Sequence, residues 1–279
     1  MRTIVHLSDL HFGKVDAALL APLRALVERL EPDVVVVSGD LTQRARSAQF
    51  QQARAFLDSL PGPQIVVPGN HDVPLYNVFS RFLTPLVKYR RYLTDDLSPE
   101  YVDEEIAVLG INTARSLTFK DGRISHEQID FLRERLGRLP PGLTRIIVTH
   151  HPFDLPEHFD EDDLVDRAPQ ALQMFSECGV DLLLAGHLHA SVAGNTAERY
   201  KIAGYAALMV QAGTATSTRG RGESNSFNVL KVEASCIRVE RYSWNDAAAD
   251  FEKVSTEAFE RQGGVWASLR PLQGLRRSD

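Results

Sequence analysis

The stretch IVVPGNHDVP, residues 65 to 74, decides how the fold of this chain is interpreted. Its β-branched run, residues 65 to 67, leads straight into Asn70, His71 and Asp72 with no apolar spacing between them. A short continuous apolar run is typical of a strand that is covered on both faces. The stretch therefore predicts a buried strand whose carboxyl end delivers three polar side chains to one point.

Similar apolar runs recur along the first 190 residues, at TIVHL (3–7), DVVVVS (33–38), IAVLGIN (106–112), RIIVTH (145–150) and DLLLAG (181–186). Between them, apolar residues recur at helical spacing within three segments, residues 15–30, 50–60 and 125–139. The third segment opens with Ser125 and Gln128, which have the spacing of a capping box. Strands that alternate with helices predict an α/β fold for this part of the chain.

The chain after residue 195 is rich in strand-like segments, namely YKIAGY, AALMVQAG, FNVLKVEA and SCIRVERYSW. We expect these segments to form a second sheet that packs on the first and is completed by the C-terminal part. One domain is predicted over residues 1–245, with an insertion or lid at residues 75–104. Residues 246–279 are assigned to a C-terminal extension of unknown role, and we expect the last 30 residues to form a peripheral helix or tail.

Composition excludes some classes of partner. The formal net charge is −6 and the isoelectric point is near 5.9, so no global basic surface recruits a nucleic-acid polymer or an anionic membrane. No apolar run approaches the roughly 20 residues of a membrane span, and the N-terminus becomes polar at Ser8, too early for a signal peptide. Two widely separated cysteines, Cys178 and Cys236, suit a reducing compartment, so we expect a cytoplasmic protein.

Polar residues follow the carboxyl ends of five predicted strands: Asp9 and His11, Gly39 and Asp40, Asn70 and His71, His150 and His151, and His187 and His189. In an open α/β sheet these strand ends share one edge, where ligands bind. Carboxylates, imidazoles and a carboxamide, without thiolates, suit hard or borderline divalent ions such as Mn, Fe, Zn or Ni. The sequence therefore predicts a metal site at this edge, whereas His6, His126 and His158 are interpreted as structural or surface residues.

These motifs resemble those of the calcineurin-like, or binuclear, metallophosphoesterases, whose pattern is DxH, GD, GNHD, a His after a strand, and GHxH. The corresponding motifs here are DLH (9–11), GD (39–40), GNHD (69–72), THH (149–151) and GHLH (186–189). The resemblance covers roughly residues 1 to 235. It implies an α/β fold in four layers, an αββα sandwich of two mixed β-sheets flanked by helices, and an enzyme that hydrolyses phosphoric esters with metal ions.

The resemblance also implies how two divalent ions are held. One ion is assigned to Asp9, His11, Asp40 and His189, and the other to Asp40, Asn70, His150 and His187, so that Asp40 bridges them. Two divalent ions carry four positive charges, and Asp9, Asp40 and a bridging hydroxide together remove three of them. The site then presents a net charge of about +1 to a phosphate. The neutral carboxamide of Asn70 preserves this net positive charge, whereas a carboxylate at that position would cancel it. We expect manganese or iron, or both, with zinc, nickel and cobalt as alternatives.

By the same resemblance, the metal-bridging hydroxide is the nucleophile and His71 is not a metal ligand. His71 is expected to face the scissile phosphate, where it stabilises the transition state or protonates the leaving oxygen. Asp72 is the second candidate catalytic residue, and it either holds the imidazole of His71 in the useful tautomer or caps a following helix. His151 either supports the neighbouring ligands or shapes the turn before Pro152.

Substrate choice is suggested by the segments SDLHFG, SGDLT and THHP, which are similar to those of bacterial class III cyclic nucleotide phosphodiesterases. The resemblance implies a small phosphodiester substrate, such as a cyclic nucleotide or a glycerophosphodiester. One alternative is a nucleotide-linked lipid precursor that is hydrolysed during peripheral contact with a membrane. Another alternative is a scaffold of the same fold without catalytic activity. A homodimer also stays open.

Candidate substrate contacts are Arg44, His151, Arg219 and Arg221, because guanidinium forks match phosphate oxygens and His151 adjoins the metal ligands. Arg219 and Arg221 lie in the segment 217–228, which could instead be a surface hairpin without a role. The stretch 76–92 interleaves aromatic and basic residues. It either roofs the site or forms a helix that packs by its aromatic side chains and leaves its basic ones in solvent.

Overall fold

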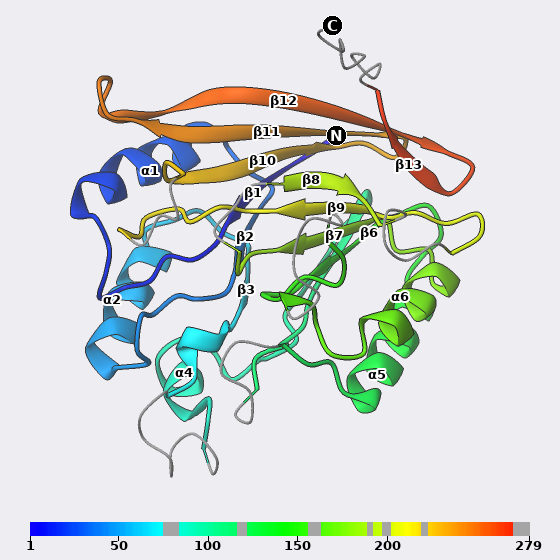
Figure 1. Ribbon diagram of the computed structural model, residues 1–279, viewed down its shortest axis with the longest axis horizontal. Helices are drawn as coiled ribbons and strands as arrows, with labels where there is room; N and C mark the ends of the chain where they lie inside the picture. The colour runs from blue at the N-terminus through cyan, green and yellow to red at the C-terminus, as the bar shows by residue number, and fades with distance from the viewer. Residues whose placement is uncertain are drawn as a thin grey trace, which may run out of the picture.

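The computed structural model describes residues 1–74, 84–115, 122–155, 163–188, 192–196, 202–218 and 223–269. Two β-sheets lie face to face in the middle of the molecule, and helices cover their outer faces (Figure 1). The helices are α1 (Ala17–Arg29), α2 (Ser47–Leu57), α4 (Val87–Tyr92), α5 (His126–Gly137) and α6 (Ala168–Glu177), and a 3-10 turn, η1, covers Asn70–Asp72. The four-layer αββα fold predicted from the sequence is confirmed.

The first sheet has the order β13-β12-β11-β10-β1-β2-β3. Its strands are β1 (Arg2–Leu7), β2 (Val34–Ser38), β3 (Gln64–Val67), β10 (Ser226–Val232), β11 (Cys236–Asn245), β12 (Asp250–Gln262) and β13 (Val265–Ser268). Strands β1, β2 and β3 are parallel, and the other four join antiparallel. This sheet is therefore mixed, and its parallel part carries the first three polar motifs.

The second sheet has the order β4-β5-β6-β7-β9-β8. Its strands are β4 (Glu100–Val102), β5 (Ile106–Gly110), β6 (Thr144–Val148), β7 (Leu182–Ala185), β8 (Val192–Asn195) and β9 (Leu208–Gln211). Strands β5, β6, β7 and β9 are parallel, whereas β4 and β8 are antiparallel edge strands. Strands β6 and β7 carry the two histidine motifs at their carboxyl ends.

Alternate residues of the central strands enter different cores. In β2, Val34 and Val36 pack between the two sheets, whereas Val35 and Val37 pack under α1 and α2. A third core lies between the second sheet and helices α5 and α6. Because both faces of these strands are buried, their sequences are continuous apolar runs and not alternating ones. The capping box of α5 also forms, since Ser125 Oγ accepts from Gln128 N at 3.2 Å.

The expectation that the C-terminal strands build the second sheet is wrong. The second sheet starts with β4 at residue 100, and of the described strands after residue 195 only β9 joins it. Strands β10 to β13 instead extend the first sheet, because β10 pairs antiparallel with the free edge of β1, with Val5 opposite Val229. Hydrophobic pattern identifies a strand but does not specify its neighbour, so the sequence could not distinguish these pairings.

The expectation of a peripheral helix or tail after residue 245 is also wrong for residues 250–268, which are strands β12 and β13. Strand β12 pairs with β11 from Asn245 opposite Asp250 to Cys236 opposite Glu260. Most of β12 is exposed or half-buried, so its polar sequence hides its strand character. The predicted domain boundary after residue 245 falls in the turn between these two paired strands.

The described part of the stretch 76–92 behaves as a packed helix. Tyr89 of α4 is fully buried and its ring meets that of Phe50 at 6.4 Å, while Tyr92 stacks on the same ring. Arg90 and Arg91 are exposed. Residues 76–83 lie outside the described part, as do residues 75–83 of the predicted insertion. Among the helices that the structure describes, none has the length and apolar character needed to cross a membrane.

Candidate metal centre

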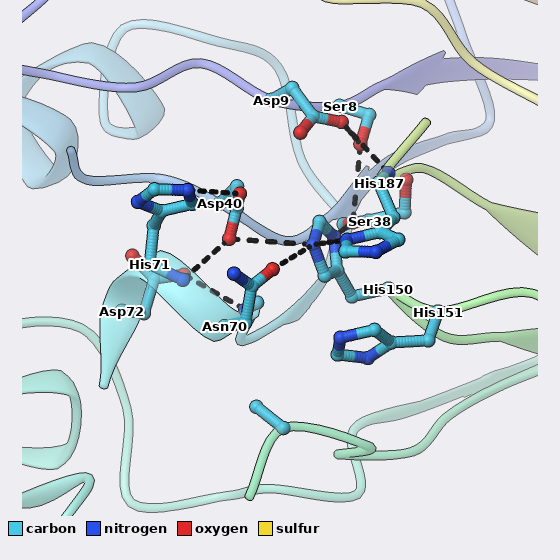
Figure 2. A network of polar contacts seen from close by, with 12 residues as sticks. Ser8, Asp9, Ser38, Asp40, Asn70, His71, Asp72, His150, His151 and His187 are labelled. Atoms are coloured by element: carbon cyan, nitrogen blue, oxygen red, sulfur yellow. Dashed lines mark hydrogen bonds and ion pairs between the residues drawn. The ribbon is translucent and has the colours of Figure 1, made fainter. Parts of the chain in front are cut away.

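Five segments that are far apart in the sequence meet at one edge of the two facing sheets (Figure 2). Asp9, Asp40 and Asn70 follow strands of the first sheet, and His150 and His187 follow strands of the second. The backbone N–H of His187 donates to Asp9 Oδ2 at 3.1 Å across a separation of 178 residues. The structure thus brings together the side chains that the sequence placed at strand ends.

Backbone strain is concentrated at these residues. Asp9, His11, Asp40 and His187 have φ values of 54°, 50°, 53° and 76°, in the left-handed region. They make up half of the eight non-glycine residues with positive φ in the described part of the chain. Such conformations cost of order 1–3 kcal/mol each and persist only where surrounding contacts enforce them, most often at functional sites. The fold therefore holds these side chains in place against a local conformational cost.

A glycine precedes three of the predicted ligands and permits close approach. A Cβ at Gly39 would lie 2.6 Å from the His150 ring, and one at Gly186 would lie 2.8 Å from Asp9 Oδ2. A Cβ at Gly69 would collide with the carboxylate and backbone nitrogen of Asp40. These glycines are required because each loop of the centre passes against a side chain of another loop.

Asp40 lies between two groups of donor atoms. Its Oδ2 is 3.6 Å from His11 Nε2, which is also 3.5 Å from Asp9 Oδ1. Its Oδ1 is 3.4 Å from His150 Nε2. Burial alone would raise the pKa of Asp40, but His150 and His11 lower it more, so that the pKa lies below its usual value. Asp40 is therefore a carboxylate that both groups can share.

The second group of donors converges on His150 Nε2, which lies 3.1 Å from Asn70 Oδ1 and 3.3 Å from His187 Nδ1. The other ring nitrogen, Nδ1, is 2.8 Å from the carbonyl of Ser38 and so carries the proton of the neutral ring. Nε2 then faces the oxygens of Asn70 and Asp40 with its lone pair. A cation among these atoms satisfies them all, so the residues fit a metal ion.

Ser8 and Ser38 support the centre and were not identified from the sequence. Ser8 Oγ donates to Asp9 Oδ2 at 2.6 Å and to the Ser38 carbonyl at 3.2 Å. Ser38 Oγ lies 2.9 Å from Nε2 of the buried His6, whose pKa is lowered to about 3 by burial. The signal in the sequence was their position, because Ser8 directly follows β1, Ser38 is the last residue of β2, and each stands next to a motif. His6 is structural, as predicted.

Asp72 does not contact the His71 ring, contrary to the first of its two expected roles. Its carboxylate accepts from the N–H groups of Leu41, Thr42 and Gly69 and from the Thr42 hydroxyl, at 2.8 to 3.2 Å. The imidazole of His71 is oriented instead by the carbonyl of Gln43, 3.0 Å from Nδ1. Burial and the charge of Asp40 raise the pKa of Asp72 to about 6. Asp72 thus ties two ligand-bearing loops together.

The predicted substrate contacts have different outcomes. His151 is fully buried, with Nδ1 2.9 Å from Thr113 Oγ1 and its ring centroid 4.6 Å from that of His187, so it packs behind the ligands. Arg44 is half-buried in the turn after Asp40, where its N–H donates to Gln49 Oε1 at 2.9 Å. His189, Arg219 and Arg221 lie outside the described residues and stay predictions.

Comparison with known families agrees with this geometry. Residues 2–191 match the family model of the calcineurin-like phosphoesterases. The chain belongs to this family. Phosphoesterases of this family use divalent metal ions, and three groups of described residues place one donor atom each within 4.8 Å of the others: His150, His151 and His187; His11, Asp40 and His71; and Asp9, Asp40 and His150. The prediction of a metal-dependent phosphoesterase is confirmed at the level of the family.

Relatives of the phosphoesterase include a probable cyclic nucleotide phosphodiesterase of Synechococcus, 26% identical over 67% of this chain and 73% of that protein. A glycerophosphodiester phosphodiesterase of Enterobacter lignolyticus is 33% identical over 37% of this chain and 44% of its own length. Among solved structures, PhoD superposes with a TM-score of 0.75 at 10% identity, covering 98% of this chain and 72% of that one. This last similarity concerns the fold alone.

Proposed function

We propose that the chain is a phosphodiesterase that hydrolyses small phosphodiesters, such as cyclic nucleotides, at a centre of two divalent ions. The observation that carries this proposal is the position of Asp40, whose two oxygens face different donor groups, His11 on one side and His150 on the other. The relatives in Synechococcus and Enterobacter are named for phosphodiester hydrolysis, which favours diesters over other esters.

Asp9, His11 and Asp40, together with His189, would hold one ion. Asp40, Asn70, His150 and His187 would hold the other. When bound, the two ions supply Lewis acidity, which activates a water molecule and neutralises charge on the phosphoryl oxygens. Oxygen and imidazole donors without sulfur suit manganese or iron, and also zinc, nickel or cobalt.

His71 is the group proposed to act on the substrate. Its side chain is 21% exposed, whereas those of His11 and His150 are 0% exposed, so a substrate can reach its ring. Its Nδ1 faces the Gln43 carbonyl, and therefore Nε2 is the atom directed toward the centre. In the protonated ring, Nε2–H donates to a phosphoryl oxygen or transfers its proton to the leaving oxygen.

Substitution of His71 tests the proposal. His71→Ala should retain its metal content while losing about 10²- to 10⁴-fold in turnover of bis(p-nitrophenyl) phosphate, the range for a general acid. His126→Ala is the matched control, because His126 is exposed at the start of α5. Both variants are reconstituted with manganese and analysed for metal content and turnover. Unchanged turnover in His71→Ala refutes the proposed role.

Substrate class is tested by screening cyclic AMP, a glycerophosphodiester, a UDP-linked acyl sugar and a simple monoester. A nucleotide-linked lipid precursor is less favoured as a substrate, because Tyr89 and Tyr92 of α4 pack against Phe50 and do not offer an aromatic surface. The scaffold alternative is not favoured either, since the six predicted ligands in the described part of the chain all lie at the centre. We further propose a cytoplasmic location, which the free cysteines Cys178 and Cys236 favour.

A further inference from the structure

A pocket of about 470 Å³ lies between the start of α4 and the loop that follows β5. One wall is formed by Leu86 and Arg90 at α4, and another by Asn112, Ala114 and Arg115 in the loop after β5. Figure 1 shows α4 at the lower end of the molecule, on the side of α2. The pocket therefore has one arginine on each wall.

The pocket adjoins the metal centre through both walls. Thr113, between two lining residues, has its hydroxyl 2.9 Å from Nδ1 of His151, which packs against the ring of His187. On the other wall, Lys88 Nζ donates to the Ala45 carbonyl at 3.1 Å and holds α4 against the loop after Asp40. The segments that line the pocket are thus bonded to segments that carry or support the predicted ligands.

Arg115 is held rigidly in the pocket wall. Its Nη2 donates to Gln128 Oε1, and Nε2 of the same amide donates to the Asn112 carbonyl at 2.8 Å. The partner of the guanidinium is therefore a neutral amide. Fixed donors of this kind lose little conformational freedom when an anion binds.

Among the described residues, no acid pairs with the two arginines of this pocket. In the described ranges, no carboxylate lies within 4.0 Å of the guanidinium of Arg115 or Arg90. Burial first, and then the charges of Arg123 and Arg167, lower the pKa of Arg115, while Glu127 opposes them only weakly. Partly burying an uncompensated charge is unfavourable, so an anion entering the pocket gains interaction energy that solvent does not supply there.

We propose that this pocket binds a phosphate monoester carried by the phosphodiester substrate, an inference that rests on the proposed phosphodiesterase function. A phosphate monoester carries close to two negative charges and three acceptor oxygens, which suits a pocket lined by two guanidinium groups from different segments. Among the small phosphodiesters proposed as substrates, the inference favours those with a second, terminal phosphate, such as a 5′-phosphorylated dinucleotide. A cyclic mononucleotide has a single phosphate, which the metal centre would take.

A pair of dinucleotides that differ only in the terminal phosphate tests this inference. The probes are diadenosine dinucleotides with a non-hydrolysable methylenephosphonate linkage, with and without a 5′-phosphate. Calorimetric titration of the manganese-loaded full chain should give a Kd about tenfold or more lower for the 5′-phosphorylated probe, since hydrogen bonds between charged groups are strong. Equal affinities, or no binding of either probe, overturn the inference.

Variants locate the effect. Arg115→Gln should remove the preference for the 5′-phosphate, Arg115→Lys should keep part of it, and Arg90→Gln should weaken it. Arg90 makes no described side-chain hydrogen bond, so its loss does not threaten folding. Arg138→Gln is the matched control, because Arg138 is exposed and pairs with Glu134 on α5. A preference that survives in both Arg115→Gln and Arg90→Gln overturns the inference.

Turnover of bis(p-nitrophenyl) phosphate separates this inference from the proposed function. That substrate has one anionic group and does not need the pocket, so its turnover by the full chain reports on the phosphodiesterase function alone, and the control Arg138→Gln should match the wild-type rate within about threefold. Normal turnover without a phosphate preference refutes the pocket alone. A phosphate preference without turnover of any diester refutes the phosphodiesterase proposal alone.

Discussion

Substitution of Gly69 by alanine should disrupt the metal centre through a single steric contact. Gly69 has φ −104° and ψ −178°, which any residue adopts, so the backbone itself tolerates alanine. The added Cβ would nevertheless lie 2.9 Å from Asp40 Cγ and closer still to the Asp40 carboxylate and backbone nitrogen. Real Cβ atoms essentially never show contacts under 3.0 Å, so one of the two loops must move.

Neither loop can move freely. The Asp40 carbonyl accepts from His11 N at 2.9 Å, and its carboxylate accepts from His71 N at 2.9 Å. Overpacking at such a position costs about 1–3 kcal/mol of folding free energy. A displacement of about 1 Å of the carboxylate that both ions would share should lower turnover on the order of 10²-fold. We expect Gly69→Ala to fold, to bind less manganese and to lose most of its activity.

Gly137→Ala is the matched control for this experiment. A Cβ at Gly137, the last residue of α5, would meet nothing within 4 Å. Alanine in a helix is favoured over glycine by about 1 kcal/mol, so this variant should equal or exceed the wild-type stability. Urea unfolding, manganese stoichiometry and turnover of bis(p-nitrophenyl) phosphate are measured for both variants. Wild-type metal content and turnover in Gly69→Ala refute the reasoning.

Three further changes test the groups around the ligands. Ser8→Ala removes the 2.6 Å hydrogen bond to Asp9 and should weaken manganese affinity about 10- to 100-fold, measured by metal titration of turnover. Asp72→Asn replaces an acceptor of several buried bonds by an amide and should cost about 1–3 kcal/mol in urea unfolding, and an unchanged stability would contradict its bracing role. His6 has its pKa lowered from 6.5 to about 3, so below pH 6.5 the unfolded chain binds a proton that the folded chain does not. Stability should therefore fall as the pH falls, by about 2 kcal/mol from this group between pH 7.5 and 5, and His6→Gln should lack that part of the loss in urea unfolding.

The strands that carry the motifs could be predicted because their information is local. Val34 to Val37 are buried on both faces of the sheet, and the sequence shows this as a continuous apolar run that is followed by Ser38, Gly39 and Asp40. Parallel strands place such ends at one edge, so the convergence of Asp9, Asp40 and Asn70 after β1, β2 and β3 was predictable, whereas His150 reaches them from the second sheet. The sequence was sufficient for this part of the site.

The neighbours of the C-terminal strands could not be predicted because pairing is a long-range property. Val5 and Val229 lie opposite each other in β1 and β10, and nothing in either segment specifies the other. Strand β12 was missed for a different reason, since it is mostly exposed or half-buried and reads as polar. The first error concerns the edge that a strand extends and the second concerns the type of element, and neither alters the edge where the ligands meet.

The supporting bonds around the ligands also escaped prediction, because adjacency in sequence was mistaken for contact. Asp72 follows His71 directly, yet in the turn η1 its carboxylate faces Leu41 and Thr42 while the imidazole faces Gln43. Successive residues of a 3-10 turn point in directions about a third of a turn apart. A carboxylate next to a histidine in sequence is therefore poor evidence that the two interact.

The metal centre is a property of the interface between the two sheets and not of any one loop. Asn70 comes from the first sheet and His150 from the second, and the ring of His150 is fixed by a carbonyl of the first, Ser38, at 2.8 Å. The residues between the sheets, such as Val36 and Ile146, are fully buried and set the spacing of the two halves. Because the donor atoms of Asn70 and His150 lie 3.1 Å apart across this interface, a small shift of one sheet against the other changes the donor geometry of the centre. Packing between the sheets therefore contributes to the preorganisation of the site, in addition to the strained residues that carry the ligands.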